Sequence, residues 1–232
     1  MKNFFKQKAF TFIELIVVVS VIAVLMTIIV PSAQKVLINS RKSKAQNYMK
    51  QIAEGYARYY NEKGYIPQKS SGQDLAHEFA KNGELNNANI YIFPGDAKAA
   101  DVAYETIYPQ DGGNWPWEKN AGGYGEFSVY LVSGITEDVN VSTTPVAFSR
   151  GLTAAGSWKS DGAFGIDGGF VSFLDGQVRW YKNLADDGGK LSTYNGSPSS
   201  SSIQASPFLA ACVRALASAT NARNSSCHGT AT

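Results

Sequence analysis

Glu14 is the only charged side chain in an otherwise apolar run from Phe10 to Val30. A carboxylate in the apolar layer of a membrane costs on the order of a few kcal/mol unless it is paired, so such residues usually have a function. Cleavage of the Ala9–Phe10 bond would create an α-amino group four residues before Glu14, and residues four apart share one face of a helix. This spacing predicts that the new amine neutralises the carboxylate, within one chain or between neighbouring chains.

The length of this run and its flanks decide between three kinds of membrane segment. At 1.5 Å per residue it spans about 32 Å, close to the hydrocarbon thickness of a bilayer. A cleavable secretory signal has a shorter apolar stretch of ~7–15 residues followed by a small-x-small site, whereas Pro31 follows here. A plain anchor leaves Glu14 unexplained. We therefore predict a basic leader at residues 1–9 and a membrane or filament-core helix at 10–30.

Residues 8–15, with the sequence KAFTFIEL, resemble the class III signal of type IV pilins and type II secretion pseudopilins. The resemblance implies that a prepilin peptidase cleaves after Ala9 and N-methylates Phe10. It also implies that Glu14 directs assembly and that Pro31 kinks the helix. Ala9 departs from the family, which prefers Gly at this position.

The same resemblance implies a structural, non-enzymatic subunit. It would cross the inner membrane once and then assemble with copies of itself into a helical filament, built by pilus or type II secretion machinery. The filament would be extracellular or periplasmic, and a surface pilus and a secretion pseudopilus both remain open, as do a major and a minor subunit.

Beyond the membrane segment, residues 31–64 predict an amphipathic helix, because apolar residues recur at steps of three and four. Gly64 and the nearby Pro67 predict its end. The apolar positions are Val36, Leu37, Ala45, Tyr48, Met49, Ile52, Tyr56 and Tyr59.

Basic residues without any acid also mark this helix: Lys35, Arg41, Lys42, Lys44 and Lys50. They outnumber the leader lysines, so a positive-inside count alone would leave the head in the cytoplasm. The cysteine pair and the cleavage signal favour export instead. Three interpretations of this run stay open: a solvated helix face, contact with acidic residues of adjacent subunits, and contact with lipid headgroups. DNA binding is weakly supported.

Residues 65–182 predict a globular head, and the whole chain an α+β fold with a long helix packed on an antiparallel sheet. A short helix is expected at 72–81, and strands are expected where apolar residues alternate, around 127–132 and 146–149. Asp175-Gly176 predicts a two-residue type I′ hairpin that pairs Phe173 with Val178. One apolar face, formed by Val171, Phe173, Val178 and Trp180, would then lie on the long helix.

Residues 144–152 and 168–178 resemble a pseudopilin-like subgroup in which a "PV…RGL" strand precedes a "GG.v.F.DGhV" hairpin. Gln177 stands where many members carry His. The remaining region, 183–232, is Gly- and Ser-rich, with a short helix expected at 206–219. Cys212 and Cys227 predict a disulfide in an oxidising compartment, with two free thiols as the alternative.

Composition argues against most enzymes and nucleic-acid binders. The 232 residues carry a net charge of +2 and two histidines, His77 and His228, so zinc modules and histidine-based triads have few candidate residues. Asp161 with Asp167, and Asp186 with Asp187, are the candidate calcium ligands, but Asx-rich turns account for them better. We expect no cofactor or metal. The alternatives are a minor pilin acting in adhesion or DNA uptake, hinted at by Trp115 and Trp117, and a membrane-anchored enzyme.

Overall fold

The chain is represented by a computed structural model. Side chains and backbone are described for residues 11–69, 71–96, 106–108, 127–135, 139–153 and 156–184, and backbone alone for 190–192, 198–202 and 226–228. Several predicted features lie outside the described residues: Ala9, Phe10, Trp115, Trp117, Asp186, Asp187, Cys212 and the helix expected at 206–219. The chain divides into two compact units, residues 1–42 and residues 43–232.

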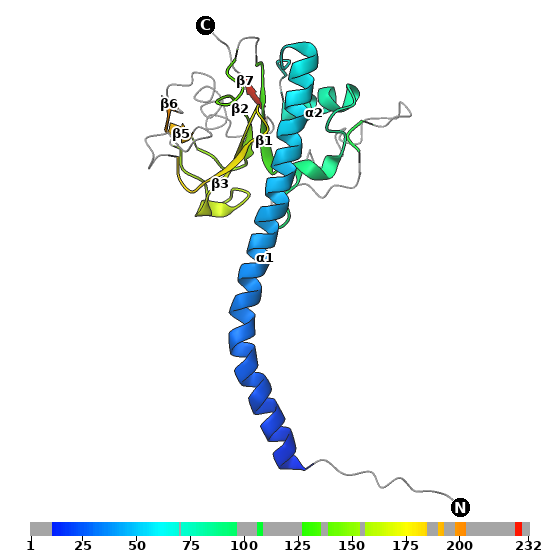
Figure 1. The fold of residues 1–232 in the computed structure, drawn as a ribbon. Helices are drawn as coiled ribbons and strands as arrows, with labels where there is room; N and C mark the ends of the chain where they lie inside the picture. Colours follow the sequence, from blue (N-terminus) through cyan, green and yellow to red (C-terminus); the bar gives the residue numbers. More distant parts are fainter. Residues whose placement is uncertain are drawn as a thin grey trace, which may run out of the picture. The chain divides into compact units, whose positions relative to one another are not determined.

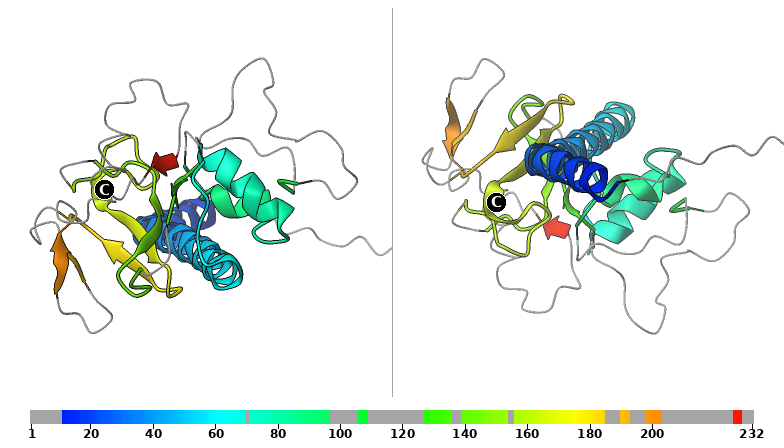
Figure 2. Two further views of the ribbon diagram at one scale, coloured as in Figure 1. Left: turned by 90° about the horizontal axis from the view of Figure 1, so that it is seen from above. Right: turned by 90° about the horizontal axis from the view of Figure 1, so that it is seen from below.

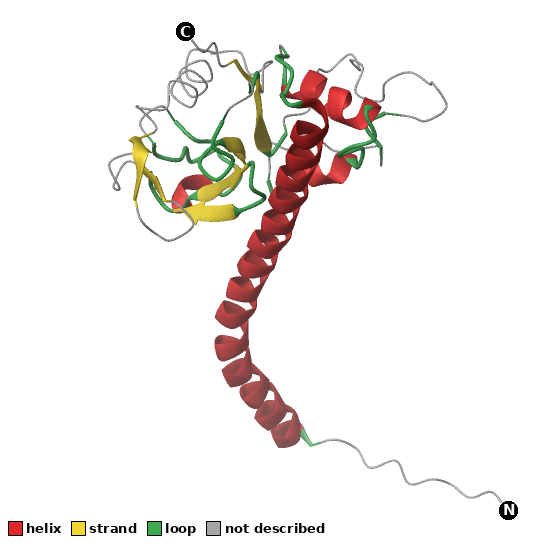
Figure 3. Cartoon of the chain, turned by 45° about the horizontal axis from the view of Figure 1, so that its top comes forward, coloured by secondary structure: helices red, strands yellow, loops and turns green. Residues whose placement is uncertain are grey.

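Helix α1 runs from Phe12 to Lys63, which confirms the predicted long helix. It is one continuous helix through Pro31 (Figure 3). The helix stops at Gly64, whose φ of 81° suits glycine, and the Gly64 N–H donates to the Tyr60 carbonyl at 2.7 Å. The predicted stop signal therefore works as a glycine cap.

Only the carboxyl-terminal part of α1 has a buried face. Its buried residues recur at helical spacing: Ala45, Met49, Ile52, Ala53, Gly55, Tyr56 and Tyr59. The predicted apolar face was wrong at its beginning, because Val36 and Leu37 are 66% and 58% exposed. These two residues belong to the amino-terminal unit, where none of the described residues is buried up to Lys42.

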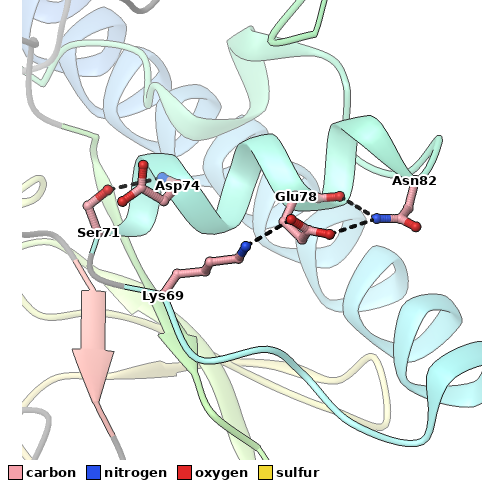
Figure 4. Close-up of polar contacts among 5 residues, drawn as sticks. All are labelled: Lys69, Ser71, Asp74, Glu78 and Asn82. Atoms are coloured by element: carbon pink, nitrogen blue, oxygen red, sulfur yellow. Dashed lines mark hydrogen bonds and ion pairs between the residues drawn. The ribbon is translucent and has the colours of Figure 1, made fainter.

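Helix α2, Gly72–Lys81, has the predicted bounds and packs against this buried face. The Phe79 ring lies 4.6 Å from that of Tyr56 and 5.0 Å from that of Tyr59. Ser71 caps α2 by accepting the Asp74 N–H at 3.0 Å, while Glu78 accepts from Lys69 and Asn82 (Figure 4). Short 3₁₀ turns, η1 (Ala88–Tyr91) and η2 (Gly165–Asp167), follow later in the chain.

The head sheet has the strand order β4-β3-β2-β1-β7. Neighbours within β1 to β4 are antiparallel, which confirms the α+β arrangement, whereas β7 runs parallel to β1. The bounds are β1 Val129–Ser133, β2 Pro145–Ser149, β3 Gly169–Phe173, β4 Val178–Tyr181 and β7 Ser226–His228; β5 (Lys190–Ser192) and β6 (Pro198–Ser202) form a separate antiparallel pair. Helix α2 lies beside the carboxyl-terminal part of α1 and also contacts strand β1 directly (Figures 1 and 2).

The register predicted for the β3–β4 hairpin was wrong by one residue. Ser172 pairs with Val178 and Val171 with Arg179, and the Phe173 N–H donates to the Gln177 carbonyl at 2.9 Å. The loop therefore has three residues, with Gly176 at a φ of 84°. A type I turn followed by a left-handed glycine is the usual three-residue solution, and it uses the same Asp-Gly pair.

This shift also overturns the predicted apolar face. Residues directly opposite each other share a face, so Phe170 and Trp180 lie on one side of the hairpin. Their rings lie 4.8 Å apart, and both contact Phe164. On the other side, the Arg179 guanidinium lies 5.6 Å from the centre of the Phe173 ring. Strands β2 and β3 are buried along their whole length, so neither shows the polar alternation expected of a half-exposed strand.

Candidate functional site: the amino-terminal helix

Thr11 and Glu14 form a reciprocal cap at the start of α1. The Thr11 N–H and hydroxyl both donate to Glu14 Oε2, at 2.8 and 2.9 Å, and the Glu14 N–H donates back to Thr11 Oγ1 at 3.3 Å. This is a capping box, which satisfies backbone donors that the first helical turn leaves open. Helix α1 therefore begins at Phe12, and the Glu14 carboxylate is held at its first turn.

The cap occupies one of the two carboxylate oxygens of Glu14. Both Thr11 donors go to Oε2, and no donor among the described residues bonds to Oε1. An ionised carboxylate has about four lone-pair sites, so the cap leaves acceptor capacity on Glu14. The geometry lets Glu14 accept a further charged donor without first giving up its cap.

The other polar side chains of the apolar segment are satisfied inside the helix. Ser20 Oγ donates to the Val17 carbonyl at 2.8 Å, and Thr27 Oγ1 donates to the Val24 carbonyl at 2.7 Å. Just beyond Pro31, Ser32 Oγ donates to the Ile28 carbonyl at 3.0 Å. Because these hydroxyl groups donate inside the helix, their donors are not open to a neighbouring chain. Glu14 is the one charged group of the segment.

Around Glu14 the helix surface is apolar and exposed. Phe12 is 79% exposed and Val24 is 63% exposed, and no residue of α1 before Lys42 is buried. Helix α1 also has an apolar window long enough to cross a membrane, with a mean hydropathy of 3.0. A helix apolar on all sides needs an apolar environment, supplied by lipid or by other helices.

The remaining predicted site residues are not gathered around Glu14. Pro31 lies about 26 Å further along α1, as the rise per residue requires. Cys227 lies in β7, which is described by its backbone, so the predicted disulfide with Cys212 stays a prediction. His77 is half-buried, with its ring 5.2 Å from that of Tyr108. Among the described residues no three His, Cys, Asp or Glu side chains gather as a metal site.

Residues 150–152, the "RGL" of the strand that resembles the pseudopilin-like subgroup, have a structural role in the head. Arg150 forms a buried ion pair with Asp96 and donates from Nη1 to the Asp161 carbonyl at 2.7 Å. Gly151, at a φ of 109°, lies so close to Gly162 that an added Cβ would come within 2.6 Å of its Cα. Arg150 and Gly151 thus connect the end of β2 to the loop before η2.

The capping role of Thr11 was missed from the sequence. Its signal, a Thr three residues before a Glu at the start of an apolar run, is present and is typical of a capping box. The predicted partner of Glu14 was an amine alone. The carboxylate has both a local partner in the chain and capacity for a second one.

Comparison with known proteins places a family motif on this same segment. Residues 4–30 match the model of the prokaryotic N-terminal methylation motif. No curated protein and no solved structure matches the chain. The matched range contains the predicted cleavage site, the Thr11–Glu14 cap and the apolar run as far as Val30. The chain thus carries, at its amino terminus, the class III signal of type IV pilins and pseudopilins.

Proposed function

We propose that this protein is a structural subunit which polymerises into a helical filament after prepilin peptidase removes residues 1–9. The observation that carries the proposal is the methylation motif at residues 4–30, whose helical part, 12–30, has an exposed apolar surface and Glu14 as its one charge. A motif of this type favours a structural role over a catalytic one. Before assembly the apolar segment anchors the chain in the inner membrane.

In the proposed mechanism, cleavage creates the Phe10 amine and Glu14 accepts it through the carboxylate oxygen that the cap leaves open. The amine belongs to the same chain or to a neighbour in the growing filament. Lipid is as apolar as Leu, so transfer of the helix from membrane to filament gains little from hydrophobic burial. Selectivity for a particular neighbour therefore depends on Glu14 and on helix packing.

Glu14→Ala tests this mechanism, with Thr27→Ala as a matched control in the same apolar segment. We expect Glu14→Ala to be inserted and cleaved like the wild type, but to give at least about tenfold fewer filaments, because an unpaired amine in an apolar layer costs on the order of a few kcal/mol. The measurements are the mass of the mature chain and the filament yield in sheared material or from a secretion system overexpressing the subunit. Thr27→Ala loses only an internal hydrogen bond and should assemble normally.

Wild-type filament yield from Glu14→Ala would overturn the role of Glu14. Polymerised chains that still carry residues 1–9, found by mass spectrometry, would overturn the processing step. Filaments at the cell surface would identify a pilus, and short periplasmic filaments a secretion pseudopilus.

A further inference from the structure

The part of α1 that follows the apolar run carries positive charge and no acid. Between Glu14 and Glu54 the chain contains no Asp or Glu, while Lys and Arg occur five times. Lys50 lies 3.9 Å from Glu54 and so has an acidic neighbour on the same helix. The other four, Lys35, Arg41, Lys42 and Lys44, are called the basic collar below.

Three of the four collar side chains are available to a partner. Lys35, Arg41 and Lys44 are exposed, and these three form no ion pair with any described residue. Lys42 is half-buried. Four like charges within ten residues repel one another, so an anionic partner stabilises the arrangement.

The charges cover one half of the helix circumference. At 100° per residue, Arg41, Lys42 and Lys44 lie at about 240°, 340° and 180° from Lys35, so Lys35 and Lys44 lie on opposite sides of the helix. A flat protein or nucleic-acid surface on one side would leave one of these two without a partner. The headgroup layer of a membrane surrounds a spanning helix and therefore reaches both.

The distance from the apolar segment places the start of the collar at a membrane surface. The predicted membrane segment, 10–30, is about as long as the hydrocarbon core is thick, and Lys35 lies about 8 Å beyond its end. Arg41 to Lys44 lie about 17–21 Å beyond it. The headgroup layer is about 5–7 Å deep, and its surface potential extends for a further ~8 Å. Long basic side chains also reach back toward the interface.

We propose that the basic collar binds anionic phospholipid headgroups on the side of the inner membrane that faces the head. The inference rests on the proposed function, in which the subunit is anchored in the inner membrane before assembly. It adds that the anchored subunit prefers anionic phospholipids. Each basic residue near an anionic surface strengthens association about fivefold. The collar thus retains the subunit in the membrane until assembly, and offsets the unfavourable placement of positive charge on the exported side.

Lipid retention by the full-length protein tests the proposal. The wild type, the collar variant Lys35→Gln/Arg41→Gln/Lys44→Gln and the head control Lys81→Gln/Lys159→Gln/Lys182→Gln are each reconstituted into phosphatidylcholine nanodiscs with a minor share of phosphatidylglycerol. All three keep the leader lysines, both variants lose three charges, and Gln preserves helix propensity. Phosphatidylglycerol that stays bound after partial delipidation is counted by mass spectrometry.

We expect the wild type and the head control to retain phosphatidylglycerol several-fold above its share of the mixture, and the collar variant to retain at least about threefold less. The wild-type excess should vanish in about 1 M salt, where the screening length is ~3 Å. Equal retention by wild type and collar variant, or an equal loss in the head control, would overturn the proposal. So would a collar variant that retains lipid normally but forms fewer filaments, because the collar would then contact a second copy of the chain.

Insertion is measured separately, by resistance to alkaline extraction from pure phosphatidylcholine vesicles. A wild-type protein that is extracted would overturn the membrane stage of the proposed function, and the collar proposal with it. A protein that resists extraction but shows no preference for phosphatidylglycerol would overturn the collar proposal alone.

Discussion

Arg150 is a charged side chain that the head holds away from water, with 5% of its side chain exposed, and its partner Asp96 is 1% exposed. Removing one member of a buried ion pair leaves the other charge without compensation, which costs far more than the net contribution of the pair. The buried pair also joins the loop before η2 to the end of β2 through the Asp161 carbonyl. The stability of this corner therefore depends on both charges together.

We expect Asp96→Ala to lower the free energy of unfolding by about 3–5 kcal/mol. The double variant Asp96→Ala/Arg150→Met should recover a large part of that loss, because no charge is then left buried. Denaturant unfolding followed by near-ultraviolet circular dichroism measures both. A loss below about 1 kcal/mol for Asp96→Ala would show that water reaches the guanidinium.

Glu78 makes a weaker, pH-dependent contribution. Its hydrogen bond from Lys69, at 2.9 Å, holds the pKa of the Glu78 carboxyl below its usual value of 4.5, and Asn82 adds to the effect. A carboxyl whose pKa is lower in the folded state binds fewer protons than in the unfolded state, so its stabilisation is present above pH 4.5 and is lost as the pH falls through the folded pKa. Both side chains remain partly exposed, so screening limits the effect.

Glu78→Gln should therefore unfold about 0.5 kcal/mol more easily at pH 7 and show a flatter loss of stability below pH 4.5. Thermal unfolding at a series of pH values measures this. Glu62→Gln is the control, since Glu62 pairs only with its exposed neighbour Lys63. Identical pH profiles for wild type and Glu78→Gln would contradict the assignment.

Helix α1 and the segment after α2 approach each other closely at Gly55. A Cβ at Gly55 would lie 2.3 Å from Leu85 Cγ, and Leu85 itself has a φ of 52°, which a leucine rarely adopts. A glycine inside a helix costs about 1 kcal/mol relative to alanine. The close approach of the segment carrying Leu85 to α1 explains why a poor helix former occupies this position.

We expect Gly55→Ala to lower the free energy of unfolding by about 1–3 kcal/mol, because overpacking outweighs the gain in helix propensity. Gly55→Ala/Leu85→Ala should be more stable than the sum of the two single variants, since the smaller side chain makes room for the new Cβ. Thermal unfolding of the wild type, the two single variants and the double variant measures the coupling free energy between residues 55 and 85. A Gly55→Ala variant more stable than the wild type would show that Leu85 moves aside freely.

Elements with strong local signals were predicted from the sequence. The bounds of α2 were correct because its apolar residues have helical spacing, and the end of α1 was correct because Gly64 is a glycine cap. The β3–β4 register was missed because Asp-Gly serves both two- and three-residue loops, and only packing decides that Leu174 enters the loop. Local sequence thus determines where the turn lies, but not which residues face each other across it.

At the scale of the whole molecule, β7 is among the strands that the sequence did not predict. It has three residues, shows no alternation and pairs with β1, about a hundred residues earlier. No local pattern encodes a contact between such distant segments, whereas the amino-terminal motif is contiguous and could be identified directly. The amino-terminal motif was therefore identified more completely than the sheet, although the capping role of Thr11 was missed.

The parallel pairing of β7 also protects the molecule against aggregation. Without Ser226–His228, the backbone of β1 would become an open sheet edge, and four of its five residues are buried and three of those are apolar. Open apolar edges recruit strands from other chains. A chain ending at Ser225 should therefore form thioflavin-positive, detergent-resistant aggregates that the full-length protein does not form. Loss of residues 226–232 in a cell would then expose an edge for disordered association that the intact sheet covers.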